Sequence, residues 1–214
     1  MSEPIRVVLA DDHAMVRQAL AQVLEESEAI TVVGQAGNGA EALDLVAQLK
    51  PDVLVLDYSM PVMDAPGTID ALSRRDPSVK ILILTVHESI HYAVRVLESG
   101  ALGYVVKTAA AQELVDAIRA VQQGDVYISR SVSQKVLQHL RRPRADRIGV
   151  GSLSTREFEL LRVLGAGLSL KECADRLGIS TSTASTYRAR LMEKLNLRST
   201  AEIIRFALEH DIIG

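Results

Sequence analysis

The chain has few of the residues that build disulfide-rich, aromatic-rich or membrane-spanning proteins. Its 214 residues include no tryptophan and only two phenylalanines, and Cys173 is the single cysteine, so an internal disulfide is impossible. No apolar run reaches the length of a membrane span, and the N-terminal residues enter a strand pattern without a signal peptide. The five histidines show no spacing typical of metal ligands. We therefore expect a cytoplasmic protein that has no membrane partner.

The residues that are present are ordinary for a globular protein, with 48% hydrophobic and 24% charged. The length permits two domains. The net charge of −3 is divided unevenly along the chain. Residues 1–124 hold 9 lysines and arginines against 17 aspartates and glutamates, residues 125–151 hold 6 against 2, and residues 152–214 hold 9 against 8. An acidic first part and a neutral to basic second part indicate two modules with different partners.

Four short apolar runs each end at polar residues of the kind that a phosphate site needs. The runs and the residues that follow them are Ile5–Ala10 with Asp11 and Asp12, Val53–Leu56 with Asp57, Ile81–Leu84 with Thr85, and Tyr104–Val106 with Lys107. Ligands of parallel α/β sheets bind outside the carboxyl ends of the strands, so these residues can converge. Three carboxylates in one place repel one another and become stable around a hard divalent cation. A nearby ammonium and hydroxyl then suit a phosphoryl group bound to one of them.

Strand and helix patterns alternate through residues 1–124 and predict five βα units. The predicted strands are apolar throughout, which indicates burial on both faces and hence a parallel sheet with helices on each side. Helical spacing of apolar residues follows each strand, in the segments 14–26, 39–49, 67–75, 89–99 and 111–123. The sequence therefore predicts an α/β domain with a doubly wound five-strand parallel sheet.

The pattern weakens between residues 125 and 151, which is typical of a linker. A short helical stretch at Ser131–Leu140 leads into Arg141-Arg142-Pro143-Arg144 and then a segment with glycine. A basic run of this kind is by default a solvated hinge, and a DNA-contacting arm is the alternative.

Residues 152–214 are predicted to form four helices. Three S-x-x-E sequences that precede apolar helical patterns predict capping boxes, and they begin at Ser154, Ser169 and Ser199. Gly178 predicts the end of a helix over Leu170–Leu177, and either Ser180 or Ser182 would cap a longer helix that reaches Leu195. Two helices joined through such a turn favour a helix-turn-helix over a generic four-helix bundle.

With these motifs the chain resembles the NarL/FixJ (LuxR-type) family of two-component response regulators over nearly its whole length. The residues that match in the first part are Asp11 and Asp12, Val55-Leu56-Asp57-Tyr58-Ser59-Met60-Pro61, Thr85, and Tyr104-Val105-Val106-Lys107. Those that match in the second part are Leu153-Ser154-Thr155-Arg156-Glu157 and Leu191-Met192-Glu193-Lys194-Leu195. The resemblance implies a receiver domain over residues 1–124, a linker over 125–151, and a LuxR-type helix-turn-helix DNA-binding domain over 152–214.

The resemblance also implies roles for the strand-end residues. Asp57 would accept the phosphoryl group, and Mg²⁺ would be bound by Asp12, Asp57 and the carbonyl oxygen of Ser59. Asp11 would act on the metal directly or through water.

Three further residues would detect the phosphoryl group in such a receiver. Lys107 would pair with its oxygens, and Thr85 would hydrogen-bond it and shift when it arrives. Tyr104 stands at the aromatic switch position and would move inward as Thr85 moves. This change would reshape the face made by the fourth helix, fifth strand and fifth helix, and would favour a homodimer.

The expected DNA-binding residues lie mainly on the helix that ends at Leu195. They are Lys171, Ser182, Ser185, Thr186, Arg188, Ala189, Arg190 and Lys194. Lysine and arginine would contact phosphates, whereas small hydroxyl side chains can reach base edges but specify bases weakly. Members of the family commonly carry lysine at the place of Ser185, so this helix departs from the family pattern. A polar solvated helix face is the alternative reading.

We therefore expect a phosphorylation-controlled DNA-binding transcriptional regulator, not an enzyme, whose phosphodonor is a sensor histidine kinase or a small molecule. The rival from another class is a Mg²⁺-dependent phosphohydrolase with Asp57 as covalent nucleophile. Ser59 speaks against it, because a carboxylate acid would be expected two residues after that nucleophile. A regulator that works without phosphorylation is a third possibility, which the complete set of pocket residues disfavours.

Overall fold

The structure of the protein is a computed structural model that describes residues 3–60, 62–63, 65–76, 78–88, 90–109, 111–140, 150, 152–210 and 212–213. The chain forms two compact units, Met1–His139 and Leu140–Gly214. Each unit has a hydrophobic core of its own, centred on the sheet in the first and on residues such as Phe158 and Leu191 in the second.

The first unit is built on a parallel sheet. Its strands are β1 (Ile5–Ala10), β2 (Ile30–Ala36), β3 (Val53–Asp57), β4 (Lys80–Thr85), β5 (Gly103–Val106) and β6 (Tyr127–Ile128). They pair in the order β2-β1-β3-β4-β5-β6. The order of the first five is that of flavodoxin-like sheets, in which the chain changes direction across the sheet between β1 and β3. That switch point makes a crevice beyond the carboxyl ends of β1 and β3, where the ligands of such folds bind.

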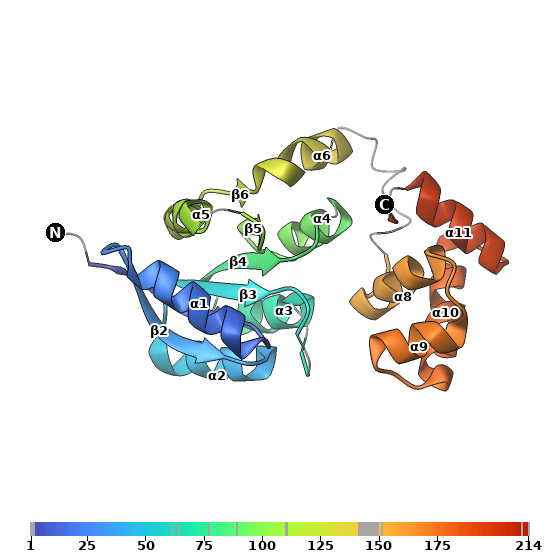
Figure 1. Ribbon diagram of the computed structural model, residues 1–214, viewed down its shortest axis with the longest axis horizontal. Coiled ribbons are helices and arrows are strands. Elements are labelled where there is room, and N and C mark those ends of the chain that lie inside the picture. Colours follow the sequence, from blue (N-terminus) through green and yellow to red (C-terminus); the bar gives the residue numbers. More distant parts are fainter. Residues whose placement is uncertain are drawn as a thin grey trace. The chain divides into compact units, whose positions relative to one another are not determined.

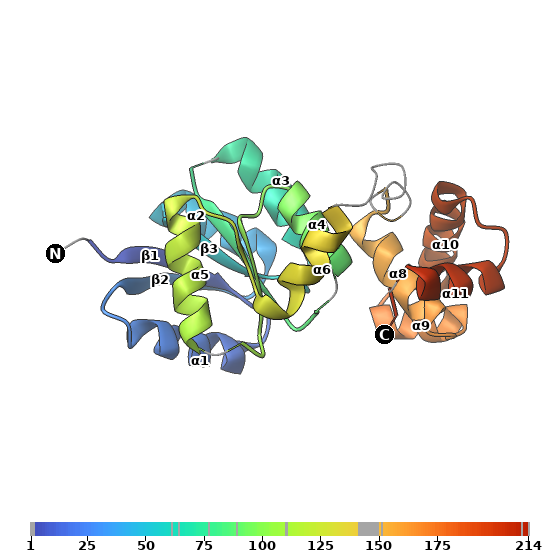
Figure 2. The ribbon, with the colours of Figure 1, turned by 90° about the horizontal axis from the view of Figure 1, so that it is seen from above.

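Helices cover both faces of the sheet. They are α1 (Ala14–Glu25), α2 (Gly39–Leu49), α3 (Ala65–Arg75), α4 (Ile90–Glu98), α5 (Ala111–Gln123) and α6 (Arg130–Leu140). The pair α1 and α5 lies on one face, whereas α2, α3 and α4 follow one another along the other (Figures 1 and 2). Every residue of β3 is buried, because this central strand is covered on both sides.

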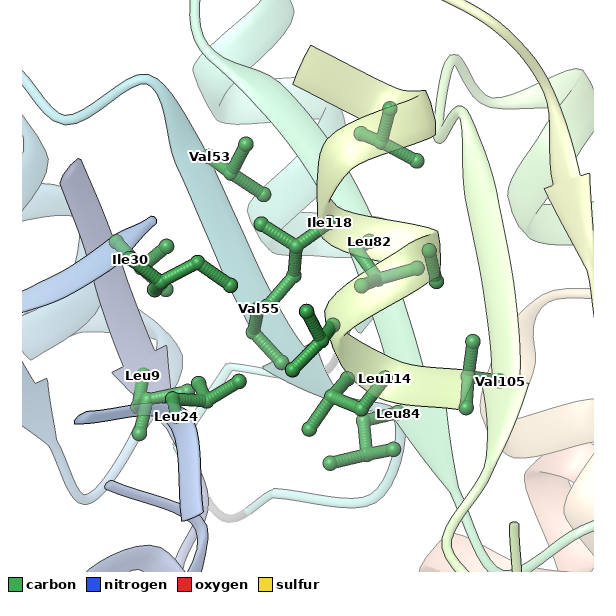
Figure 3. Packing of buried hydrophobic residues seen from close by; sticks show 14 of the residues in the cluster. Leu9, Leu24, Ile30, Val53, Val55, Leu82, Leu84, Val105, Leu114 and Ile118 are labelled. Atoms are coloured by element: carbon green, nitrogen blue, oxygen red, sulfur yellow. The ribbon is translucent and has the colours of Figure 1, made fainter. Parts of the chain in front are cut away.

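Alternate strand residues form the core beneath α1 and α5. Leu9 of β1, Val55 of β3 and Leu84 of β4 point to this face and pack against Leu24 of α1 and Ile118 of α5 (Figure 3). The residues between them point to the opposite face and are buried there as well. The continuous apolar runs of the sequence are therefore explained by a sheet buried on both faces, as predicted.

The sheet has one strand more than the five that the sequence predicted. Tyr127 and Ile128 fall in the predicted linker, but they pair in parallel with Gly103 and Tyr104 of β5. A two-residue strand has no alternation of apolar and polar residues to detect, so periodicity could not reveal it.

The helix that follows belongs to the first unit as well. It begins at Arg130, one residue before the predicted start, and its Val132 and Val136 are buried. The basic run at residues 141–144 lies outside the described residues.

The second unit consists of short helices with capped ends. They are α8 (Thr155–Gly165), α9 (Leu170–Leu177), α10 (Thr181–Leu195) and α11 (Thr200–Glu209). The predicted capping boxes at Ser154 and Ser169 are complete, with hydrogen bonds in both directions. The third prediction was wrong in part: Ser199 accepts from the N–H of Glu202, but the Glu202 carboxylate accepts from the N–H of Arg198, at 2.7 Å.

The turn between α9 and α10 has the geometry of a helix-turn-helix. Gly178 ends α9 with φ of 64° and ψ of 33°, a left-handed conformation that glycine adopts at little cost. Ser180 rather than Ser182 caps α10, because its hydroxyl accepts the N–H of Thr183. Among the described residues, no helix combines the length and apolar character that crossing a membrane would require.

Candidate functional site

Two buried aspartates and a lysine meet at the carboxyl ends of β1, β3 and β5. The Lys107 ammonium donates to Asp11 Oδ2 at 2.6 Å and to Asp57 Oδ2 at 2.9 Å. The side chains of Lys107, Asp11 and Asp57 are 14%, 3% and 7% exposed, respectively, so water screens these ion pairs weakly. Lys107 is 96 residues from Asp11 and 50 from Asp57 along the chain, and the parallel sheet brings all three together. The predicted convergence of strand ends is confirmed for these residues.

Asp12 and His13 lie beside the two buried aspartates. His13 Nδ1 lies 2.7 Å from Asp12 Oδ1, and the His13 N–H donates to Asp11 Oδ1 at 2.9 Å. Possible ligand atoms of Asp11, Asp12, His13 and Asp57 all lie within 4.8 Å of one another. The Asp57 carboxylate also accepts the N–H of Ser59. Three carboxylates at this spacing fit a hard divalent cation such as Mg²⁺, which prefers oxygen ligands.

Burial and charge act in opposite directions on this cluster. Burial raises the pKa of Asp57 above its ordinary value, and the nearby Asp11 charge adds to that rise, although Lys107 opposes it. For Lys107 burial alone would lower the pKa, but the hydrogen bonds to Asp11 and Asp57 outweigh it and raise that pKa. The lysine therefore stays charged and holds two carboxylates that would otherwise repel each other.

Thr85, His87 and Tyr104 form a chain of hydrogen bonds beside this cluster. The His87 N–H donates to Thr85 Oγ1 at 3.1 Å, and the Tyr104 hydroxyl donates to the His87 carbonyl oxygen at 2.7 Å. The Lys107 N–H donates to the Thr85 carbonyl oxygen at 2.6 Å, which ties β4 to the end of β5. Tyr104 is buried, and burial raises the pKa of its hydroxyl, which remains a proton donor. Its side chain lies inward in this structure.

An aromatic cluster supports the same chain of hydrogen bonds. The His87 ring stacks on Tyr92 with centroids 4.8 Å apart, and Tyr92 meets Tyr58 edge-on at 4.4 Å. Ser59 Oγ lies 3.5 Å from His87 Nε2, a weak contact at that distance. Because Tyr58 follows Asp57, these rings connect the end of β3 to the residues that follow β4.

In the second unit, α10 presents a polar face of small and basic side chains to solvent. Ser182, Ser185, Thr186, Ala189 and Arg190 are all exposed along it. On the opposite side Ala184 and Leu191 are buried, and Tyr187 and Leu195 are half-buried. Lys171 is exposed near the start of α9. Five of the expected DNA contacts, Ser182, Ser185, Thr186, Ala189 and Arg190, therefore lie on the exposed side of this helix.

Comparison with known families matches both units. A model described as the response regulator receiver domain matches residues 7–119, and a model described as bacterial regulatory proteins of the luxR family matches residues 151–207. The chain is 35% identical to the oxygen regulatory protein NreC of Staphylococcus epidermidis over 98% of this chain and 99% of that protein. It is 34% identical to the response regulator GacA of Pseudomonas aeruginosa, over 98% of each. The chain belongs to the NarL/FixJ (LuxR-type) response regulators.

A solved structure agrees with this assignment. RcsB of Salmonella enterica serovar Typhimurium, bound to promoter rprA in the presence of the phosphomimetic BeF3⁻, has a TM-score of 0.63 and 28% identity. The match covers 95% of this chain and 98% of that one. This response regulator therefore consists of a receiver domain with the flavodoxin-like fold and a helix-turn-helix DNA-binding domain.

Two of the predicted DNA-contacting cations of this response regulator have partners within the protein. The Lys194 ammonium donates to Glu157 Oε2 at 2.7 Å, and Arg188 donates to Thr200 Oγ1 at 3.0 Å. Glu157 is 2% exposed. Burial would raise the pKa of Glu157, but the hydrogen bonds from Lys194 and Ser154 outweigh burial and lower it. Lys194 thus fastens α10 to the start of α8 in this structure.

Sequence reasoning missed three residues of the receiver site. His13 lies among the carboxylates, Arg17 donates to the Asp11 carbonyl oxygen, and His87 bonds to both Thr85 and Tyr104. The only available signal was position: His13 directly follows Asp12, and His87 stands two residues after Thr85. Backbone hydrogen bonds such as those of His87 do not depend on side-chain type, so no pattern of residue types announces them.

Proposed function

We propose that this response regulator is phosphorylated on Asp57 and that phosphorylation controls DNA binding by residues 152–214. The convergence of Asp57 with Asp11, Asp12 and Lys107 carries the proposal. A carboxylate nucleophile, metal-binding oxygens and a phosphate-binding cation at one sheet edge are the parts that phosphoryl transfer to an aspartate requires.

The chemistry assigns a role to each group. Asp11, Asp12, Asp57 and the carbonyl oxygen of Ser59 would hold Mg²⁺, which when bound neutralises charge on the phosphoryl oxygens. A carboxylate oxygen of Asp57 attacks the phosphorus of the donor as the bond to the leaving group breaks. Lys107, already 2.9 Å from Asp57, then turns part of its ammonium toward the phosphoryl oxygens.

The same groups offer a route to the switch. If the Thr85 hydroxyl turns to the phosphoryl group, it no longer accepts the His87 N–H. The Tyr104 hydroxyl is bonded to the carbonyl oxygen of that same residue. A movement of Thr85 is thereby passed through His87 to Tyr104 and β5.

The proposal also names the partners of the protein, the boundaries of its domains and the residues that contact DNA. The phosphodonor is a sensor histidine kinase, the phosphorylated protein is a cytoplasmic homodimer, and its target is promoter DNA, since two modules double the phosphate contacts on two-fold related half-sites. The receiver extends over residues 1–124 and the DNA-binding domain over 152–214, while β6 and α6 of the intervening segment pack on the receiver. The proposed DNA contacts are Lys171, Ser182, Ser185, Thr186, Arg188, Ala189, Arg190 and Lys194, of which Arg188 and Lys194 would first leave their internal partners.

The test is labelling with acetyl phosphate followed by mass spectrometry. Asp57 should be labelled in Mg²⁺ and not in EDTA, and Asp57→Asn should abolish the label. Asp44→Asn is the matched control, since Asp44 is an exposed aspartate on α2. Capture of genomic DNA fragments by labelled and unlabelled protein then tests control of DNA binding. Full labelling of Asp57→Asn, or equal capture by both forms, would overturn the proposal.

A further inference from the structure

A buried serine between β6 and α6 is bonded to the switch strand. Ser129 is 2% exposed and directly follows β6. Its N–H donates to the Tyr104 carbonyl oxygen at 2.9 Å, and its hydroxyl accepts the N–H of Val106 at 3.2 Å. The hydroxyl thus replaces the strand carbonyl that a two-residue β6 cannot supply, and it satisfies a donor on the edge of β5. Both bonds fall on the stretch of β5 that runs from Tyr104 toward Lys107.

The same residue holds two helices. Its hydroxyl donates to Glu113 Oε1 of α5 at 2.6 Å. Its carbonyl oxygen accepts the N–H groups of Val132 and Ser133, at 2.9 and 3.0 Å, which begins α6. Val132 and Val136 are 0% and 1% exposed, so α6 is packed onto the receiver from its first turn. One side chain and one peptide unit therefore join β5, α5 and α6.

Along the chain, α6 is the element that leads from the receiver toward the DNA-binding domain. Residues 141–149 follow it and precede α8. Any change in how firmly α6 is held therefore acts on the last helix of the first unit before the chain passes to the DNA-binding domain. The side chain of Ser129 connects that element to the strand that carries Tyr104.

We propose that Ser129 is a positioning residue that transmits phosphorylation of the receiver to α6, and through α6 to the DNA-binding domain. This proposal rests on the proposed function, since it concerns the route from Asp57 to output. A shift of Tyr104 and Lys107 moves the β5 backbone groups to which Ser129 is bonded. Hydrogen bonds weaken steeply as distance and angle depart from their optimum, so the shift loosens the start of α6.

Packing of α6 alone would not require these bonds. The serine hydroxyl is the feature that distinguishes coupling from packing, because it accepts from β5 and donates to α5 at once. Without it, the buried Val106 N–H loses its acceptor and the half-buried Glu113 carboxylate loses a donor, which favours the loosened state of α6 before any phosphorylation.

The experiment is hydrogen exchange of the full chain, read by mass spectrometry for peptides within residues 130–138. Wild-type protein is compared with and without phosphorylation by acetyl phosphate in Mg²⁺, and the label is quantified by intact mass in the same samples. We expect exchange of α6 to accelerate on phosphorylation by at least about fivefold, the lower end of typical couplings between sites. An α6 that exchanges equally in fully labelled and unlabelled wild type would overturn the proposal.

Two serine variants separate coupling from helix stability. Ser129→Ala should take up label as wild type does, exchange quickly in α6 in both forms, and lose the phosphorylation-dependent gain in affinity for captured DNA fragments. Ser133→Ala is the control, since within the described part of the chain its hydroxyl bonds only to the Arg130 carbonyl oxygen of its own helix, and it should keep the full response. A Ser129→Ala protein whose α6 exchange and DNA affinity still respond fully would also overturn the proposal. Absence of label on wild type would instead defeat the proposed function itself.

Discussion

Replacing Lys107 by methionine should destabilise the receiver in a way that depends on metal and on pH. Methionine keeps the length and apolar stem of the side chain but removes the ammonium that bonds Asp11 and Asp57. Both carboxylates are buried, so neither can recover its loss from water. Removing one partner of a buried ion pair typically costs ~3–5 kcal/mol. Because Lys107 itself is slightly exposed, we expect the lower end, about 3 kcal/mol of unfolding free energy at neutral pH in EDTA.

Mg²⁺ should restore much of the unfolding free energy that Lys107→Met loses, because a divalent cation can replace the ammonium between the carboxylates. A ligand at 100 times its dissociation constant stabilises the native state by about 2.7 kcal/mol. Wild type gains less at a given concentration, since Lys107 competes with the metal for Asp11 and Asp57.

Acidification should also reduce the difference in unfolding free energy between Lys107→Met and wild type. Burial already raises the pKa of Asp57, and the variant lacks the lysine that opposes this rise. A carboxyl whose folded pKa is raised stabilises the fold at low pH, and that contribution disappears as pH rises through the folded pKa. The deficit of Lys107→Met should therefore be largest at neutral pH and smaller near pH 5.

The assay is urea unfolding followed by tyrosine fluorescence. The protein has no tryptophan, and four of its five tyrosines lie in the first unit, so this signal reports mainly on the receiver; they are Tyr58, Tyr92, Tyr104 and Tyr127. Lys80→Met is the control, because Lys80 begins β4 at the end away from Thr85 and the site. It should change the unfolding free energy by less than about 1 kcal/mol. A deficit that is the same in EDTA and Mg²⁺ at every pH would show that Lys107 acts through packing, and would refute the electrostatic reasoning.

Three more results are expected. The rate of Asp57 labelling by acetyl phosphate should rise with pH through the raised pKa of that carboxyl, because the carboxylate is the nucleophile; a rate independent of pH below neutrality would contradict this. Glu157→Gln should lose about 1–2 kcal/mol of protection against hydrogen exchange in α8, and more than Glu172→Gln loses in α9, because only Glu157 is buried against a lysine; equal losses would count against that pair. Since its pKa is lowered, the Glu157 contribution should fade as pH falls through that pKa. Arg190→Ala should weaken binding to all DNA sequences and reduce the salt slope by about 1, and a loss confined to some sequences would show that Arg190 reads a base edge instead.

The receiver site could be predicted from the sequence because one topological rule determines where strand ends lie. Asp11, Asp57 and Lys107 follow apolar runs, and parallel strands present their carboxyl ends at one edge. The relative order of the strands did not need to be known for these residues to converge. Thr85 was placed by the same argument and Tyr104 by the family resemblance, but their shared partner was not predicted, since both bond to the backbone of His87.

Sequence reasoning failed where the outcome depends on which of two similar partners is nearer. The S-x-x-E pattern at Ser199 is the same as the two that form complete capping boxes, yet Glu202 accepts from Arg198 instead. Lys194, an expected DNA contact, donates to the buried Glu157 of α8, two helices earlier in the chain, and the sequence did not reveal this internal partner. Short-range sequence patterns identify hydrogen-bond donors and acceptors correctly, but the tertiary structure determines which of them pair.

The linker is the place where this limit affects function most. Residues 125–140 have weak periodicity because they are held by one short strand and a few buried side chains, not by a long amphipathic face. Such a segment has little stability of its own and depends on the hydrogen bonds at its ends. A receiver that moves β5 by a small distance can change the state of that segment at low energetic cost, whereas the same movement could not unfold a helix with a full apolar face. Weak periodicity after a receiver domain is therefore consistent with a transmitting element as well as with a passive spacer, and Ser129 is the residue at which the two can be distinguished by experiment.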